Sequence, residues 1–327
     1  MKTLRLINTL GFAAIAMLAF VSCKNGDQEF DYDGETAVYY SNQAYVRTIE
    51  LGEDQEVDLT EDNAYSFSIY ALQAGGYNNN NDVTVSYIID PSMVEGKSME
   101  FTDGTSKSIA VMPSDYYTIE NANQFVIKKG SRMGGPKIHL TDAFFADPKS
   151  METTYVIPVK LTSATGVDKI LSDKDSTVCA VKFVNPWHAT YLRHGVDNLT
   201  FADGTTKQNV RHTQYVEKND LQTITTSGLK QAKMVVAVAD KSGVNHNVTL
   251  LLNFDDNNNC TVTTSTQGAE ATGTGKFVKS CENMGGTNRN ALYVDYNINV
   301  AGVGKMVTTD TLVVRNRGVV REYFTLK

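Results

Sequence analysis

The sequence predicts an all-β protein with two domains, an Ig-like β-sandwich followed by an up-and-down β-barrel. Short segments that alternate apolar and polar residues recur along the chain, and this period of two indicates half-buried antiparallel strands. Clusters rich in glycine and asparagine separate these segments, as expected for turns. The length of 327 residues suggests about two domains. A hydrophobic content of 41% is sufficient for packed cores.

Charge and composition exclude several classes of protein. The chain has 30 Lys plus Arg against 37 Asp plus Glu, a formal net charge of −7. Nucleic-acid binding requires a basic surface, so no nucleic-acid partner is expected. Beyond the N-terminus, no apolar run approaches the roughly 20 residues of a membrane helix. The remaining chain is expected to be a globular body.

The N-terminus has the features of a lipoprotein signal peptide, predicted over residues 1–22. Lys2 and Arg5 precede the uncharged apolar run 10–21, which suits a secretory signal but is too short to span a bilayer. The run ends at a small residue followed by Cys23. This junction resembles the lipobox of bacterial lipoproteins, which implies lipidation of Cys23 and anchoring through acyl chains. The alternative is an ordinary secreted protein in which Cys23 is structural.

Residues 23–35 are polar, acidic and without periodicity, so this segment is predicted to be a flexible tether. An acidic stretch behind a lipidated cysteine resembles the export signal of Bacteroidetes surface lipoproteins. A simple solvated linker remains the alternative.

The first globular domain is predicted over residues 36–184. Alternating segments at 65–72, 83–88 and 155–161 indicate strands. Only the segment 140–146 resembles a helical turn. Short strands with almost no helix favour an Ig-like sandwich.

The second domain is predicted over residues 185–327, after the Asn185-Pro186-Trp187 junction. Proline pushes the preceding residue into extended geometry, which is typical of a linker. Longer strands joined by short turns follow, predicted at 233–239, 248–254, 260–266, 275–281, 291–300 and 305–315. Sequential hairpins favour a meander closed into a calycin-like or lipocalin-like barrel, because closure removes the strand edges.

Several motifs resemble a family of Bacteroidetes surface lipoproteins that combine an Ig-like N-terminal domain with a lipocalin-like C-terminal domain. They are the segments 113–118, 140–149, 155–158 and 165–171 in the first half, and 214–220 and 310–318 in the second. The resemblance implies an outer-membrane lipoprotein exposed on the cell surface. It also implies an accessory role in starch-utilisation-type glycan uptake, with a polysaccharide or oligosaccharide and an outer-membrane transporter complex as partners.

The sequence contains no recognisable catalytic motif, so no catalytic residue, cofactor or metal site is predicted and the protein is not expected to be an enzyme. Acidic residues are abundant, but their spacing selects no pair for glycoside hydrolysis. His188 and His194 could share one strand face and bind a metal. The simpler interpretation is that both histidines are hydrogen-bonded or exposed and bind none.

Three cysteines remain if Cys23 is lipidated. Cys260 opens one predicted strand and Cys281 closes the next, so a hairpin centred near Glu270 would place them opposite each other. A disulfide between Cys260 and Cys281 is therefore a hypothesis, with two buried free thiols as the alternative. Cys179 lies in an apolar strand and is predicted to be part of the core.

Glycan binding needs an exposed aromatic face beside amide and carboxylate groups, since sugar hydroxyls require polar partners. Tyr77, Asn79 and Asp82 lie in the glycine- and asparagine-rich loop 75–82 and are the predicted carbohydrate-binding residues. The alternative interpretation is that Tyr77 is an exposed loop residue with no role in binding. The competing function is adhesion or binding of a host or partner protein, followed by an enzyme or a small-ligand carrier that uses the barrel interior.

Overall fold

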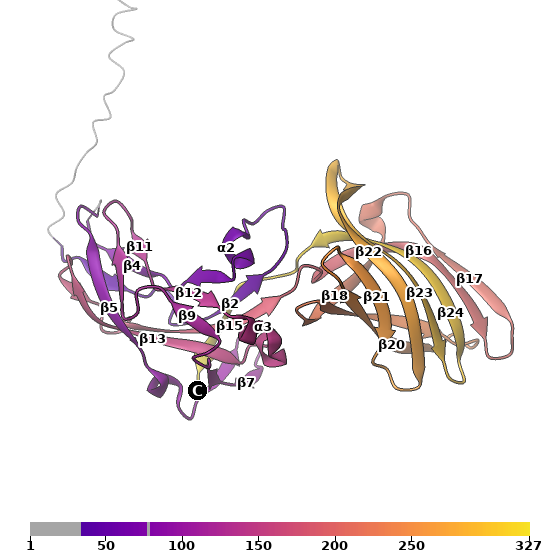
Figure 1. Ribbon diagram of the computed structural model, residues 1–327, viewed down its shortest axis with the longest axis horizontal. Coiled ribbons are helices and arrows are strands. Elements are labelled where there is room, and N and C mark those ends of the chain that lie inside the picture. Colours follow the sequence, from indigo (N-terminus) through magenta and orange to yellow (C-terminus); the bar gives the residue numbers. More distant parts are fainter. Residues whose placement is uncertain (1–33, 77–78) are drawn as a thin grey trace, which may run out of the picture.

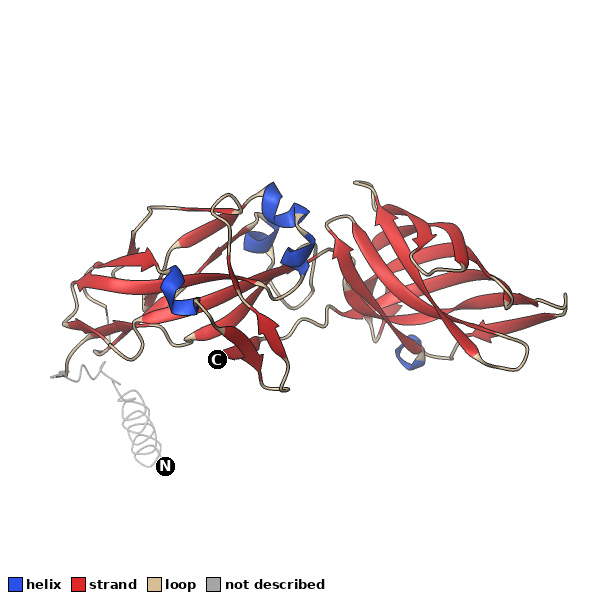
Figure 2. Ribbon diagram, turned by 90° about the horizontal axis from the view of Figure 1, so that it is seen from below, coloured by secondary structure: helices blue, strands red, loops and turns tan. Residues whose placement is uncertain are grey.

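The computed structural model describes residues 34–76 and 79–327, and it confirms the all-β fold class (Figures 1 and 2). Within these residues, no helix is long and apolar enough to cross a membrane. The helical elements of this part are single turns or little more: α2 (Thr60–Asn63), α3 (Asp142–Ala146), η1 (Pro91–Val94), η2 (Pro148–Met151) and η3 (Val216–Lys218).

The N-terminal domain is built on one large sheet. In spatial order this sheet contains β10 (Gln124–Ile127), β5 (Val83–Ile89), β13 (Tyr155–Thr165), β15 (Ser176–Val184), β2 (Ala44–Glu50), β25 (Glu322–Leu326), β6 (Ser98–Phe101) and β7 (Ser106–Ser108). β8 (Ala110–Val111) pairs in parallel with β13.

Two smaller sheets complete the sandwich. One contains β11 (Met133–Gly134), β4 (Ala71–Ala74), β1 (Ala37–Tyr39) and β14 (Lys169–Ile170), and the other contains β3 (Ser66–Ser68), β12 (Lys137–Leu140) and β9 (Tyr117–Ile119). Val38 and Ile138 from the small sheets share a buried cluster with Val85, Ile157 and Val181 from the large sheet. The alternation seen in the sequence therefore reflects one apolar core between the layers.

The C-terminal strand does not belong to the barrel. β25 pairs with β2 through Tyr45↔Tyr323 and with β6 through Phe101↔Phe324, so the chain returns to the sandwich after the barrel is complete (Figure 1). The predicted domain 185–327 is therefore corrected, because residues 322–326 form a strand of the N-terminal sheet. Phe324 is buried there in an apolar cluster that is separate from the main core of the sandwich.

The second domain is a closed antiparallel barrel. Its strands are β16 (Ala189–Phe201), β18 (Asp220–Gly228), β19 (Gln231–Ala239), β20 (Asn245–Phe254), β21 (Asn259–Thr264), β22 (Ala269–Met284), β23 (Thr287–Val300) and β24 (Gly304–Asn316). β24 pairs with β16 along most of its length and so closes the ring. β17 (Thr206–Arg211) forms a hairpin with β16.

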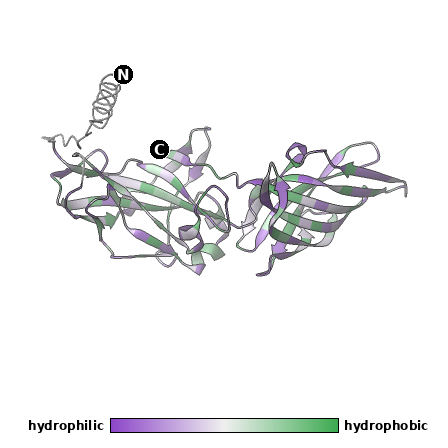
Figure 3. Ribbon diagram, turned by 90° about the horizontal axis from the view of Figure 1, so that it is seen from above, coloured by the Kyte–Doolittle hydropathy of each residue, from purple (hydrophilic) through white to green (hydrophobic). Residues whose placement is uncertain are grey.

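The barrel interior is filled by the apolar residues of the alternating strands, which appear as bands of opposite hydropathy in Figure 3. Trp187 stacks on Phe254 with ring centroids 3.9 Å apart and an interplanar angle of 6°. Trp187 is thus a core residue at the beginning of the barrel.

A charged cluster is also buried inside the barrel. Arg211 donates from Nη2 to Asp310 Oδ1 at 2.7 Å and to Asp197 Oδ1 at 2.8 Å. Arg193 donates from Nε to Asp310 Oδ2 at 2.9 Å, and the Tyr296 hydroxyl donates to the same oxygen at 2.9 Å. Burial alone would raise the pKa of Asp197, but hydrogen bonds and charge from Arg211 outweigh it and lower this pKa. We infer that the cluster fixes the register of β16, β17 and β24.

Arg317 joins the two domains. This side chain is only 5% exposed. It donates from Nη2 to Leu51 O and Asn185 O, both at 2.9 Å, and from Nη1 to Pro186 O at 3.3 Å. Since Leu51 belongs to the sandwich and Arg317 follows β24, the guanidinium holds the linker and both domains together.

Candidate functional site

The predicted sugar-binding loop is only partly described. Tyr77 lies outside the described residues. Asn79 is 4% exposed, and its Nδ2 donates to Lys128 O at 3.0 Å and to Ser131 O at 3.1 Å. The prediction that Asn79 contacts a sugar is therefore corrected, because the amide is buried and already satisfied by backbone carbonyls.

Asp82 is half exposed and anchors the same loop. Its carboxylate accepts hydrogen bonds from the backbone N–H of Lys129 at 2.8 Å and from Lys128 Nζ at 3.0 Å, and these bonds lower its pKa. A ligand would have to compete with both partners. A role for Asp82 in sugar binding remains a prediction.

The predicted disulfide is absent from the described part of the chain, where Cys179, Cys260 and Cys281 are all free thiols. The residue opposite Cys260 is Gly275 rather than Cys281. The register differs because the turn lies between β21 and β22, at residues 265–268, and because a bulge between Val278 and Glu282 shifts the later part of β22. Cys179 is a fully buried core residue, as predicted. Cys23 lies outside the described residues.

The two histidines considered for a metal site have separate partners. His188 Nδ1 accepts the backbone N–H of Thr226 at 3.1 Å, whereas His194 Nδ1 contacts Asn219 Nδ2 at 3.2 Å. Within the described ranges, no group of three or more His, Cys, Asp or Glu side chains is arranged to hold a metal ion.

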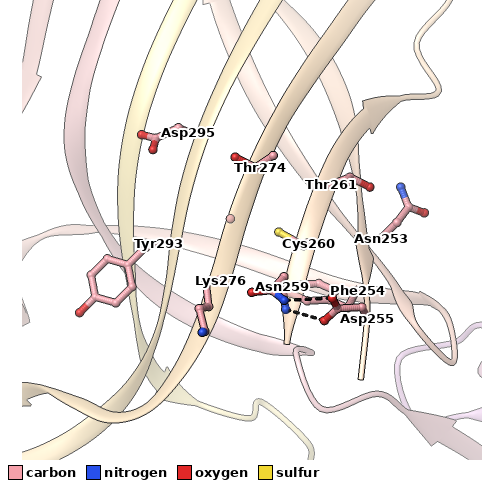
Figure 4. A pocket seen from close by; sticks show the side chains of 11 residues that line it. Asn253, Phe254, Asp255, Asn259, Cys260, Thr261, Thr274, Lys276, Tyr293 and Asp295 are labelled. Carbon is pink, nitrogen blue, oxygen red and sulfur yellow. Dashed lines mark hydrogen bonds between the residues drawn. The ribbon is translucent and has the colours of Figure 1, made fainter. Parts of the chain in front are cut away.

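The main hollow of the barrel lies on its outer face, over β20 to β24 (Figure 4). Two open depressions of about 660 Å³ and 560 Å³ meet there and share Thr274 and Asp295 in their lining. We refer to this continuous depression as the outer groove. Volumes of this size fall within the range of ligand sites for small molecules.

Two glycines explain why the wall is hollowed. Gly273 and Gly275 occupy inward-facing positions of β22, between outward-facing threonine and lysine side chains. A Cβ atom on Gly275 would lie 2.5 Å from Tyr293 O and 2.9 Å from Cys260 Sγ, and one on Gly273 would lie 2.3 Å from Asp295 O. The missing side chains let β22 approach β21 and β23 closely, as glycine does at tight bends of a barrel.

A row of polar side chains crosses the groove at one level. Asp295 of β23 is paired with Thr274 of β22, Thr274 with Thr261 of β21, and Thr261 with Asn253 of β20. Figure 4 shows these four side chains in line across neighbouring strands. The side chains of Asp295, Thr274 and Thr261 make no hydrogen bond to another described residue, so their donors and acceptors remain available. We call these four residues the polar row.

The next level of the groove supplies a cation and an aromatic ring. Lys276 is paired with Tyr293 on one side and with Asn259 on the other. The Tyr293 hydroxyl donates to Glu282 Oε1 at 2.7 Å, which fixes the ring at the edge of the groove. Burial, together with hydrogen bonds to Cys281 and Glu282, raises the pKa of Tyr293, so the phenol stays protonated.

Asp255 shapes the end of the groove. Its Oδ1 accepts from the backbone N–H groups of Asn257 and Asn259 at 2.9 and 2.8 Å, and its Oδ2 accepts from Asn259 Nδ2 at 2.9 Å. These bonds lower its pKa. The segment 255–259 is therefore a hairpin turn between β20 and β21.

Both halves of the chain match known domain families. Residues 186–318 match the model of a domain of unknown function, DUF5627, and residues 32–168 match a model described only as an N-terminal domain. The crystal structure of a Bacteroides ovatus protein of unknown function shares 37% identity with this chain. The alignment covers 91% of this chain and 99% of that protein, with a TM-score of 0.82. The chain belongs to the same family as this protein.

This family assignment confirms the predicted relationship to a two-domain Bacteroides family, while the lipid anchor remains a prediction. An auxiliary nutrient-binding protein of Bacteroides thetaiotaomicron aligns over 82% of this chain and 90% of its own length, with 15% identity and a TM-score of 0.41. A second Bacteroides ovatus protein of unknown function aligns over 89% and 100%, with 12% identity and a TM-score of 0.46. No curated protein matches the chain.

No sequence motif pointed to the outer groove. Its residues are threonine, asparagine and charged side chains at alternate strand positions, and such a pattern is typical of any solvent-facing sheet. The signal that could have indicated the site is the run Thr272-Gly273-Thr274-Gly275-Lys276, because two glycines at inward positions are unusual in a barrel strand.

Proposed function

We propose that the protein binds a glycan in the outer groove and holds it without cleaving it. The polar row is the observation that carries this proposal. Asp295 provides an acceptor, Lys276 a donor, and the threonine hydroxyls can act as either. A sugar presents hydroxyls of both kinds, and Tyr293 at the edge of the groove offers an aromatic ring for its apolar C–H face.

The spacing of the row favours a linear glycan that runs across the strands. Neighbouring strands lie about 4.8 Å apart, so the row from Asp295 to Asn253 extends over about 14 Å. An extended chain crossing the groove would present one sugar after another to successive strands. Affinity should therefore rise with oligosaccharide length until the row is filled, at about four strand positions.

The hydrogen bonds of Asp255, one of the acids in the groove, favour a binding role over hydrolysis. Glycoside hydrolysis requires one carboxylic acid with a raised pKa beside a second carboxylate. Asp255 has the opposite property, because its hydrogen bonds to Asn257 and Asn259 stabilise the ionised form. It is therefore unsuited to act as the general acid.

Titration calorimetry with a panel of linear neutral polysaccharides tests the site. We expect micromolar binding of one of them, roughly −8 kcal/mol. Asp295→Ala should weaken it about tenfold, and Tyr293→Ala by about 1–3 kcal/mol by analogy with aromatic stacking platforms. Asp115→Ala, an exposed aspartate of the other domain, serves as the matched control. Release of reducing ends would refute the binding-only role, and unchanged affinity in both groove variants would refute the site.

We further propose that acyl chains on Cys23 anchor the protein to the outer membrane, facing the cell exterior, as an accessory of a polysaccharide transporter. The apolar run 10–21 ending at Ser22-Cys23 supports this proposal. Cys23→Ala should release the protein from the membrane fraction. A variant that still fractionates with the outer membrane would contradict the lipid anchor.

A protein partner is the second candidate function, and the exposed edge of the large sheet favours it. All three residues of β7, Ser106–Ser108, are exposed at the end of that sheet. Such an edge can accept a strand from another protein. Ser106 pairs with Glu100 in a non-hydrogen-bonded position, so its N–H faces the open edge. Ser106→Pro would remove this donor, so loss of a captured transporter component in this variant, with glycan binding intact, would support this function.

A further inference from the structure

A second hollow lies at the junction of the two domains, away from the outer groove. It encloses about 480 Å³. Its walls come from η2 and the end of β15 in the sandwich, from β18 and β19 in the barrel, and from the segment 318–322 that connects the two. We call it the junction pocket. Ligand sites occur preferentially between domains.

The pocket has fixed walls. Arg317, one residue before the connecting segment, bonds to carbonyls of the linker and the sandwich. On the other side of that segment, β25 pairs with β2. Lys182 and Glu322 form an ion pair across the wall and so neutralise each other. The connecting segment that forms this wall is thus anchored at both of its ends.

Hydrogen-bond donors converge on the barrel side of the pocket. His188 Nδ1 accepts the backbone N–H of Thr226 at 3.1 Å, so the ring proton is on Nε2. Nε2 makes no hydrogen bond to another described residue and is a free donor in the pocket lining. Thr225 and Lys233 are directly paired across β18 and β19, which places a hydroxyl beside an exposed ammonium group. Burial, with the charges of Arg317 and Lys182, lowers the pKa of His188 to about 4 and keeps the ring neutral.

The sandwich side offers a different surface. Exposed Glu152 can accept hydrogen bonds, and Met151 contributes apolar surface beside it. Val320 is 70% exposed at the pocket, an unusual position for a branched apolar side chain. The pocket therefore combines donors for an anionic group on one wall with an acceptor and an apolar patch on the other.

We propose that the junction pocket binds a sugar acid, a hexuronate, with its carboxylate against Lys233, Thr225 and His188. The hydroxyls of the sugar then face Glu152, and its C–H face packs on Val320 and Met151. This site is independent of the outer groove, so either can exist without the other. Together they would allow the protein to retain a glycan that carries acidic residues.

Titration calorimetry with sodium glucuronate and sodium galacturonate tests the proposal on the intact protein. We expect saturable binding of at least one of them, and Lys233→Gln should weaken it about fivefold. Lys276→Gln makes the same chemical change in the outer groove and should leave hexuronate binding unaltered. Thr225→Val, which keeps the side-chain shape, should also weaken binding.

The neutral sugar glucose and the simple anion acetate are the controls for the ligand. Equal binding of glucose would contradict the role of the carboxylate, and equal binding of acetate would contradict the role of the sugar ring. Hexuronate binding that survives Lys233→Gln but falls in Lys276→Gln would place the ligand in the outer groove and refute the junction site. Absence of any hexuronate binding would refute it as well, and neither result depends on whether a neutral polysaccharide binds the groove.

Discussion

Arg317→Ala should destabilise the protein, because it removes the hydrogen bonds that join the two domains and the linker. The guanidinium makes two hydrogen bonds of 2.9 Å to buried carbonyls and a weaker one of 3.3 Å. A bond from a charged donor contributes about 1.5–3 kcal/mol. Burial lowers the pKa of Arg317, which shows that desolvation of the charge offsets part of this gain. We therefore expect a net loss of about 2–4 kcal/mol in the free energy of unfolding.

Urea unfolding followed by intrinsic fluorescence and circular dichroism measures this loss. Arg315→Ala, two residues earlier and exposed, is the matched control and should change stability by less than about 0.5 kcal/mol. Arg317→Met separates packing from hydrogen bonding, because it fills much of the space without donors. Proteolysis in the linker at 185–187 should also become faster in Arg317→Ala. A difference of less than about 1 kcal/mol between the Arg317 and Arg315 variants would refute the argument.

Three further predictions concern the barrel. Alkylation of the folded, non-reduced protein should label exposed Cys281 but spare Cys179 and Cys260, because burial raises the pKa of both buried thiols to about 12. A Cys260–Cys281 linkage in the mass spectrum would contradict the pairing register of β21 and β22. The lowered pKa of Asp197 stabilises the fold above the ordinary carboxyl pKa of about 3.9, and this contribution is lost as the pH falls through the folded-state pKa. The stability gap between wild type and Asp197→Asn should hold from pH 8 to about pH 5 and shrink toward about pH 2; a constant gap would count against the buried ion pair. Gly275→Ala should cost about 1–3 kcal/mol through overpacking, whereas Thr274→Ala next to it should cost little, and equal effects would contradict the close approach of β22 and β23.

The fold class followed from the sequence because strand alternation is a local signal. Residues 269–277 alternate in both type and burial, and the same holds for β19 and for β23 from Leu292 onward. Which strands pair with each other, in contrast, is not a local signal. β25 contains five residues with no feature that distinguishes a last barrel strand from a strand of another sheet. Its place beside β2 is decided by the free edge of the sandwich and by Arg317, and both arise only when the chain has folded.

Register was the weakest part of the sequence prediction. The hairpin between β21 and β22 turns at residues 265–268, and this shift moves the partner of Cys260 from Cys281 to Gly275. A shift of the pairing by an even number of residues, such as the six from Cys281 to Gly275, keeps every side chain on its face, so the alternation pattern does not reveal it. The bulge between Val278 and Glu282 adds a second shift. Two cysteines at suitable ends of consecutive strands were therefore compatible with a disulfide that the structure does not contain.

The candidate site could not be predicted for a related reason. A sugar-binding loop was expected where tyrosine and asparagine cluster in sequence, but Asn79 is buried against backbone carbonyls. In the groove, the polar row collects one side chain from each of four strands that are up to 42 residues apart, from Asn253 to Asp295. Each of them alone looks like an ordinary surface residue. Beneath the row, Gly273 and Gly275 let β22 lie close against β21 and β23, so the residues that shape the groove are inward-facing and are not part of the polar row.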